Sequence, residues 1–182
     1  MGREAAKGMA MHKDIQEKIK QLCDSKITFE SDWTVKLYDD IQDIMQANQW
    51  KCDDVIAALP EKLQTVYALQ DLIAAINCDG FFSVFYNKPL YEIKRLRRAI
   101  DLAEMKLVGD LYDEAFQLVK SKFTWSDEHI NFVTQQINQG DNPDCNEFFG
   151  DEIANRFEEI EEQISATLYN DYEKRLESYL KS

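Results

Sequence analysis

Apolar side chains recur every third or fourth residue along almost the whole chain of 182 residues, and this spacing constrains the fold more than any other feature. Residues three and four apart share one face of an α-helix, whereas alternation by two would predict strands. The chain has only six glycines and three prolines, too few for the many turns of an all-β architecture. The pattern therefore predicts an all-α fold.

The same spacing divides the chain into about seven or eight helices. We expect them near residues 12–24, 31–48, 53–58, 60–77, 89–100, 106–122, 124–137 and 149–182, the last as one long helix or two consecutive ones. Ser31 is expected to cap the second helix, and Pro60 to lie in the first turn of the fourth. The sequence QGDNPDCNE, at 139–147, is typical of a loop. We predict a single compact domain over 12–182, preceded by a leader or disordered segment at 1–11.

One short segment, FFSVFYN at residues 81–87, is the densest aromatic stretch in the chain. By its composition we expect a short irregular or strand-like segment here, although seven residues alone do not decide between helix and strand. We expect Gly80 to supply a positive φ and Phe81 and Phe85 to fill the core. Asn87 is expected to cap the helix that begins at Pro89.

Motifs of common enzymes are missing from the sequence. There is no GxGxxG, no GxxxxGK[ST], no GxSxG and no HExxH, and the two histidines, His12 and His129, share no local motif. The four cysteines form no CxxC pair and are interpreted as reduced thiols. The sequence therefore predicts a non-catalytic protein without a cofactor or a metal site.

The charge balance points to basic partners. Thirty-four acidic residues against 21 basic ones give a net charge of −13, and the sequence pI is about 4.6. Such a field repels nucleic acid and anionic membranes and attracts basic proteins. No run of 18 apolar residues could span a membrane, and the first residues are not a secretory signal. We expect a cytoplasmic protein that binds neither nucleic acid nor membrane directly.

Acidic residues are concentrated in the C-terminal part of the chain, 141–182. Within 151–162 six acids and one base, Arg156, give a net charge of −5. At about 1.5 Å of rise per residue this is one net charge per ~3.6 Å of helix, close to the ~3.4 Å between phosphates along one DNA strand. We call these six carboxylates the acidic stripe: Asp151, Glu152, Glu158, Glu159, Glu161 and Glu162.

The acidic stripe is also expected to be one-sided. At about 100° per residue, its members fall within about 180° of arc, and Ile153, Phe157 and Ile160 fall on the opposite side. An acidic outer face is also common on ordinary amphipathic helices. One segment has the opposite sign: residues 88–98 carry five bases and one acid, for a net charge of +4. We expect its bases to pair with the protein's own acids or to be solvated.

Several residues in the middle of the chain carry a resemblance to a known family. Leu59-Pro60 opens a helix, and Asn77, Gly80, Phe81, Phe85, Tyr86 and Asn87 follow in the family's order. With them the core from 55 to 119 resembles a bacterial family of acidic, mostly helical DNA-mimic proteins, otherwise classed as a domain of unknown function. Tyr169, Tyr172 and Tyr179 look like its closing helix. Asp79 stands where the family has the first of two paired glycines, and Leu102-Ala103-Glu104 stands in place of a glycine-containing turn.

The resemblance implies a protein that occupies the DNA-binding surface of a basic protein, such as a transcription factor. The acidic stripe is then the predicted partner-binding face. Two alternatives stay open: an immunity-type inhibitor of a basic toxin, and a small-ligand binder with a cleft walled by Phe82, Tyr86 and Tyr91. The sequence is also compatible with a homodimer.

Overall fold

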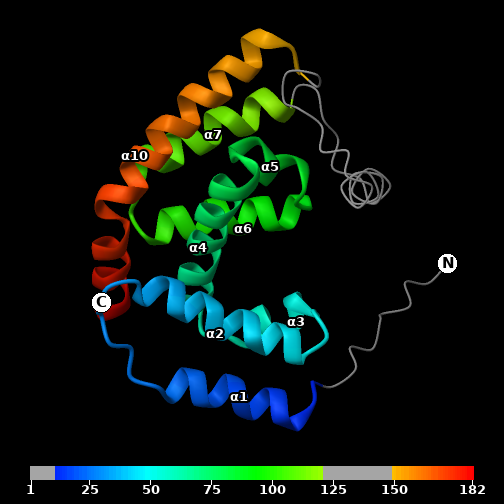
Figure 1. Ribbon diagram of the computed structural model, residues 1–182, viewed down its shortest axis with the longest axis vertical. Coiled ribbons are helices and arrows are strands. Elements are labelled where there is room, and N and C mark those ends of the chain that lie inside the picture. The colour runs from blue at the N-terminus through cyan, green and yellow to red at the C-terminus, as the bar shows by residue number, and fades with distance from the viewer. Residues whose placement is uncertain (1–10, 121–148) are drawn as a thin grey trace, which may run out of the picture. The chain divides into compact units, whose positions relative to one another are not determined.

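The computed structural model describes residues 11–120 and 149–182, and these residues form an all-α fold, as predicted (Figure 1). Their helices are α1 (Lys13–Asp24), α2 (Trp33–Ala47), α3 (Cys52–Ala58), α4 (Glu61–Asp79), α5 (Phe81–Tyr86), α6 (Leu90–Leu102), α7 (Lys106–Lys120) and α10 (Asp151–Lys181). No strand occurs in this part of the chain. The helix expected at 124–137, the loop expected at 139–147 and most of the expected leader lie outside the described residues.

The chain groups into two compact units, residues 1–64 and 65–182. The single domain predicted for residues 12–182 stays a prediction. None of the helices described in either unit is both long enough and apolar enough to cross a membrane.

In the first unit, α1 packs against α2 and α2 against α3. Helix α1 buries Ile15 and Ile19, four residues apart, as its amphipathic pattern requires. The prediction that Ser31 caps α2 is wrong, because the helix begins at Trp33 and Asp32 is its N-cap residue. The prediction that Pro60 lies in the first turn of α4 is also wrong, because the helix begins at Glu61. Pro60 precedes it, and the Pro60 carbonyl accepts a hydrogen bond from the Gln64 N–H at 3.0 Å.

The aromatic segment of the second unit is a short helix, α5, rather than a strand. Helix α4 ends at Asp79, and Gly80 has a φ of +77°, which a glycine adopts without strain. Phe81 and Phe85 have no exposed surface, so they fill the core as predicted. The Tyr112 hydroxyl, also buried here, donates a hydrogen bond to the Ile93 carbonyl at 2.9 Å, and burial raises its pKa well above the usual range.

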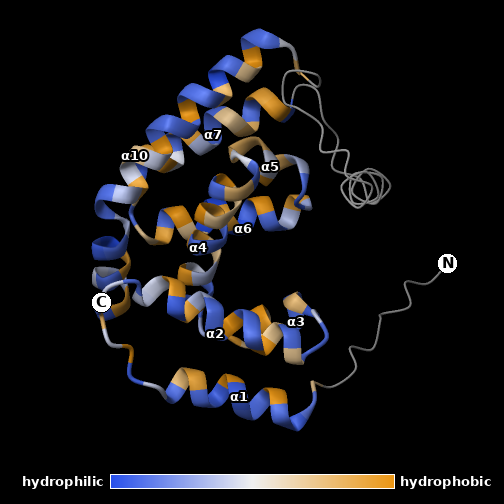
Figure 2. Ribbon diagram, in the orientation of Figure 1, coloured by the Kyte–Doolittle hydropathy of each residue, from blue (hydrophilic) through white to orange (hydrophobic). Residues whose placement is uncertain are grey.

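Helices α6, α7 and α10 complete the second unit. Helix α7 packs against α6 and against α10, and α10 also packs against α5. Figure 1 shows the first part of α10 lying alongside α7. Residues 151–181 form one continuous helix, so the expectation of one long helix is confirmed over the alternative of two consecutive ones. In Figure 2 the outer side of this helix is largely hydrophilic, while its buried residues lie four or three apart, from Ala154 through Phe157 to Ile160 and Ile164.

Candidate functional site

Five of the six members of the acidic stripe are exposed. They are Asp151, Glu152, Glu158, Glu159 and Glu162, all on the first three turns of α10. Phe157 and Ile160 are buried on the opposite side of the same turns. Within the described residues, Glu158 and Glu162 make no side-chain hydrogen bond or ion pair. The structure therefore brings most of the predicted residues onto one face, while their role in partner binding stays a prediction.

The sixth member, Glu161, is half-buried and has a different contact. Its Oε2 accepts a hydrogen bond from the Phe81 N–H at 2.6 Å, so it caps the first turn of α5 from another helix. A Cβ atom on Gly80 would lie only 3.4 Å from that oxygen. At about 100° per residue, Glu161 lies on the arc between two buried residues, Ala154 and Leu168. The sequence missed this because small Ala154 was not recognised as part of the buried side.

Arg156 ties the acidic stripe to the neighbouring helix. Its Nε and Nη2 donate hydrogen bonds to the two carboxylate oxygens of Glu114, on α7, at 2.6 and 2.9 Å. Its Nη1 donates to Glu159 at 2.6 Å. The hydrogen bonds from Arg156 hold the pKa of Glu114 below its usual value. The one base of this segment thus pairs with two carboxylates, and it neutralises the centre of the stripe rather than its ends.

Aromatic packing beneath the acidic stripe fixes α10 on α5. The Phe157 ring lies 6.1 Å from the Phe81 ring and 6.0 Å from the Phe85 ring, centroid to centroid. Phe82 packs edge to face against Phe149 at 5.2 Å. These distances are typical of favourable aromatic pairs. The aromatic motif therefore positions the helix that carries the carboxylates.

Three tyrosines of α10 make a ladder of hydrogen bonds to α4. Tyr169 donates to Asn77 Oδ1 at 2.7 Å, and Tyr172 donates to the Gln70 side chain. The Tyr179 and Thr65 hydroxyls lie 3.3 Å apart. The sequence singled out Asn77 and these tyrosines only through the resemblance, because hydrogen bonds between residues about a hundred positions apart leave no local pattern.

The remaining motif residues serve the fold. Asn87 does not cap the next helix as predicted: α6 begins at Leu90, its N-cap residue is Pro89, and Asn87 lies at the C-terminal cap of α5 instead. Tyr86 is 2% exposed and Tyr91 is 53% exposed. A wall of the predicted aromatic cleft would face solvent, and Tyr86 does not.

The basic segment, residues 88–98 at the start of α6, pairs largely with the protein's own acids, which is one of the two expectations. Lys88 Nζ lies 2.7 Å from Asp71 Oδ2. Arg97 Nε and Nη2 donate to both carboxylate oxygens of Asp113, on α7, at 2.7 and 2.9 Å. The hydrogen bonds to Asp113 and to Asp101 raise the pKa of Arg97 above its usual value.

Comparison with known proteins identifies a family for most of the chain. The family model of DMP19-like proteins matches residues 57–182, which include the aromatic motif, the acidic stripe and the tyrosine ladder. DMP19 proteins are DNA mimics. No curated protein and no solved structure matches the chain. The match covers more than half of the sequence, and the chain therefore belongs to the DMP19-like protein family.

Proposed function

We propose that this protein is a non-catalytic DNA mimic in the cytoplasm, and that its acidic stripe occupies the DNA-binding surface of a basic protein. The observation that carries the proposal is the exposure of five carboxylates on the first turns of α10, four of which have no ion-pair partner among residues 11–120 and 149–182. Membership in a DNA-mimic family supports it independently.

The negative charge of the protein would attract a basic partner over a long range. The stripe repeats its net charge at about the interval of phosphates along one DNA strand, ~3.4 Å. The protein as a whole carries −13, so the field attracts a basic surface from a distance. Two features keep the spacing of the charges fixed during the encounter: α10 is continuous, and Phe157 is packed beneath it. A preorganised charge array contributes more to association than flexible side chains do.

Charge reversal on the stripe tests the proposal. The immobilised protein should capture DNA-binding proteins from a lysate at low salt, and duplex DNA should displace the captured protein. Glu158→Lys with Glu162→Lys changes the net charge of 151–162 from −5 to −1. Association with the captured and purified partner should then slow by about 10- to 1,000-fold at low ionic strength. Both side chains are exposed, so the free energy of unfolding should change by only about 0.5 kcal/mol.

A matched control separates the stripe from net charge alone. Asp39→Lys with Asp43→Lys changes the total charge equally on two exposed positions of α2. We expect this variant to keep most of the binding. Equal losses in both double variants would show that only net charge matters, and a partner that binds DNA and this protein at the same time would contradict mimicry.

A further inference from the structure

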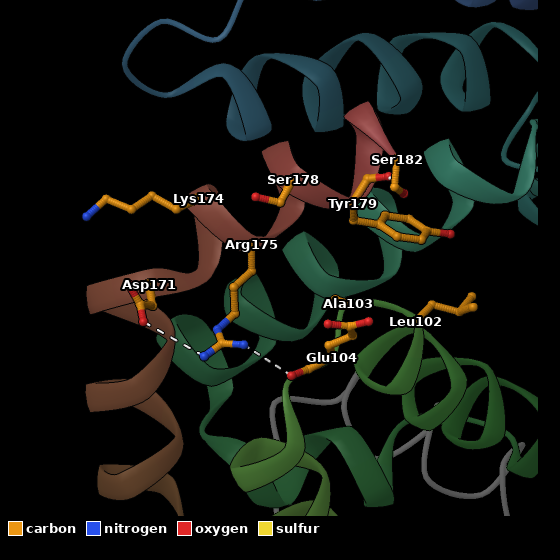
Figure 3. Close-up of a pocket in the computed structure, with 9 residues that line it drawn as sticks. All are labelled: Leu102, Ala103, Glu104, Asp171, Lys174, Arg175, Ser178, Tyr179 and Ser182. Atoms are coloured by element: carbon orange, nitrogen blue, oxygen red, sulfur yellow. Dashed lines mark hydrogen bonds and ion pairs between the residues drawn. The ribbon is translucent and has the colours of Figure 1, made fainter.

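A pocket of about 450 Å³ opens at the other end of α10, where this helix meets the turn between α6 and α7 (Figure 3). All its lining residues belong to the unit formed by residues 65–182. Its volume lies in the range of about 300–1,000 Å³ that is usual for small-molecule sites. The pocket is separate in sequence from the acidic stripe, because its α10 residues begin at Asp171.

Charged residues of both signs line this pocket, and only Arg175 and Asp171 form an ion pair among the lining residues. Arg175 Nη1 donates a hydrogen bond to the backbone carbonyl of Glu104 at 3.2 Å. Its Nη2 lies 3.9 Å from Asp171 Oδ2, a long ion pair. The Glu104 carboxylate makes no hydrogen bond or ion pair within the described part of the chain. Figure 3 shows the Arg175 side chain reaching from α10 toward the backbone of Glu104.

The backbone at Glu104 is held in an unusual conformation. Its φ is +54°, in the left-handed region that glycine adopts most easily. The Met105 N–H reaches back to the Ile100 carbonyl at 3.1 Å, which is the bond that closes a helix with a left-handed residue. A glycine would fit this turn with less strain, yet a charged residue lines the pocket here. Strain of this kind is common at binding sites.

We propose that the pocket binds a small zwitterion of the α-amino acid type. The ligand carboxylate would accept hydrogen bonds from the free guanidinium N–H groups of Arg175 and from the Ser178 hydroxyl, which also lines the pocket. The ligand ammonium group would donate to the Glu104 carboxylate. This function goes beyond the proposed DNA mimicry and needs none of the stripe's residues.

The charges of the pocket favour a dipolar ligand over a simple ion. The lining has two acids, Glu104 and Asp171, and two bases, Lys174 and Arg175. A simple anion would be repelled by both carboxylates and by the protein's overall charge of −13. A simple cation would be attracted by the two carboxylates and by the overall charge, but it would be opposed by Lys174 and Arg175 and would leave the remaining N–H groups of Arg175 without an acceptor. A ligand with both charges can complement both groups at once.

Calorimetry and thermal unfolding of the full chain test this proposal. Each standard amino acid is added separately at millimolar concentration, and we expect at least one to raise the unfolding temperature and to give a measurable heat of binding. For that amino acid, the N-acetyl derivative lacks the cation and the amide lacks the anion. Each should bind at least about tenfold more weakly, because one charged hydrogen-bond partner is lost.

Variants connect the binding to the two charged groups. Glu104→Gln and Arg175→Gln should each abolish binding, while Glu177→Gln, on the same helix and outside the pocket, should not. Glu104→Gly should abolish binding and also raise the unfolding temperature by about 2 °C, because glycine relieves the backbone strain. A merely structural glutamate would not produce both effects together.

Several results would overturn the proposal. They are the absence of any shift or heat with every standard amino acid, binding of either derivative as tight as that of the parent amino acid, and unchanged binding in Glu104→Gln. If Arg175→Gln fails to fold, Glu104→Gln decides, because it retains the backbone carbonyl to which Arg175 is bonded.

Discussion

Two segments of the second unit carry a concentrated charge of one sign and use it in opposite ways. In the basic segment, residues 88–98, the three bases Lys88, Arg95 and Arg97 each have a carboxylate of this same unit within 4 Å. On α10, the exposed ends of the acidic stripe have no such partners among the described residues, and only Glu159 forms an ion pair there, with Arg156. The basic segment stabilises the fold, whereas the acidic stripe is left for solvent or a partner.

The difference shows that the density of charge along a segment does not decide its role. The outcome depends on what neighbouring helices offer, and here the total composition is decisive. With 34 acids and 21 bases, at least 13 acids have no base left to pair with one to one. The bases of the basic segment therefore find partners on α4, α6 and α7, and the surplus of acids remains exposed on helices such as α10.

Removing a paired base should destabilise the protein most. Arg97→Met keeps the length of the side chain but leaves Asp101 and Asp113 without their shared guanidinium. The two aspartates are more than half exposed, so solvent screens both pairs and each contributes up to about 1 kcal/mol; because Arg97 serves both and is itself only partly exposed, we expect a loss of about 1.5 kcal/mol. Urea denaturation measures this loss.

The matched change on an exposed base of the same helix is Lys94→Met. It should alter the free energy of unfolding by no more than about 0.5 kcal/mol. Equal losses in the two variants would mean that the ion pairs of α6 contribute nothing beyond general charge.

The second prediction compares two adjacent carboxylates within the acidic stripe. Glu161→Ala removes the acceptor of the Phe81 N–H and should lower the free energy of unfolding by about 1 kcal/mol, as the loss of a helix cap does. Glu162→Ala removes an exposed carboxylate and should change it by no more than about 0.5 kcal/mol. The ranking should invert for partner binding, with the larger loss in Glu162→Ala. The same ranking in both assays would contradict the separation of roles.

The helices themselves could be predicted from the sequence, because a spacing of three and four is a local property. The apolar spacing predicted helices at 31–48 and 149–182, and the observed helices α2 and α10 begin and end within two residues of these positions. Contacts between distant helices could not be predicted in this way. The capping role of Glu161, the bonds from Arg156 to Glu114 and the tyrosine ladder all depend on which helix lies opposite. Cap positions also failed, because moving a helix start by one or two residues, as at Trp33 or Leu90, transfers the cap to another residue.

The smallest expected effect concerns the place where the two kinds of charge meet, the pair of Glu114 and Arg156. The pKa of Glu114 is lowered in the folded state, so this carboxylate stabilises the fold above its unfolded pKa, near the ordinary value of 4.5. That contribution is lost as the pH falls through the lowered folded pKa. Because the Glu114 side chain is 42% exposed and solvent screens the pair, we expect only a few tenths of a kcal/mol. The loss of stability between pH 7 and pH 3, measured by urea denaturation at each pH, should be smaller in Glu114→Gln than in the natural sequence. Arg156→Gln should reduce this loss similarly, because the substitution removes the donor that lowers the pKa of Glu114. If Glu114→Gln lost as much stability at low pH as the natural sequence does, the pair of Glu114 and Arg156 would contribute nothing measurable to the stability of the fold.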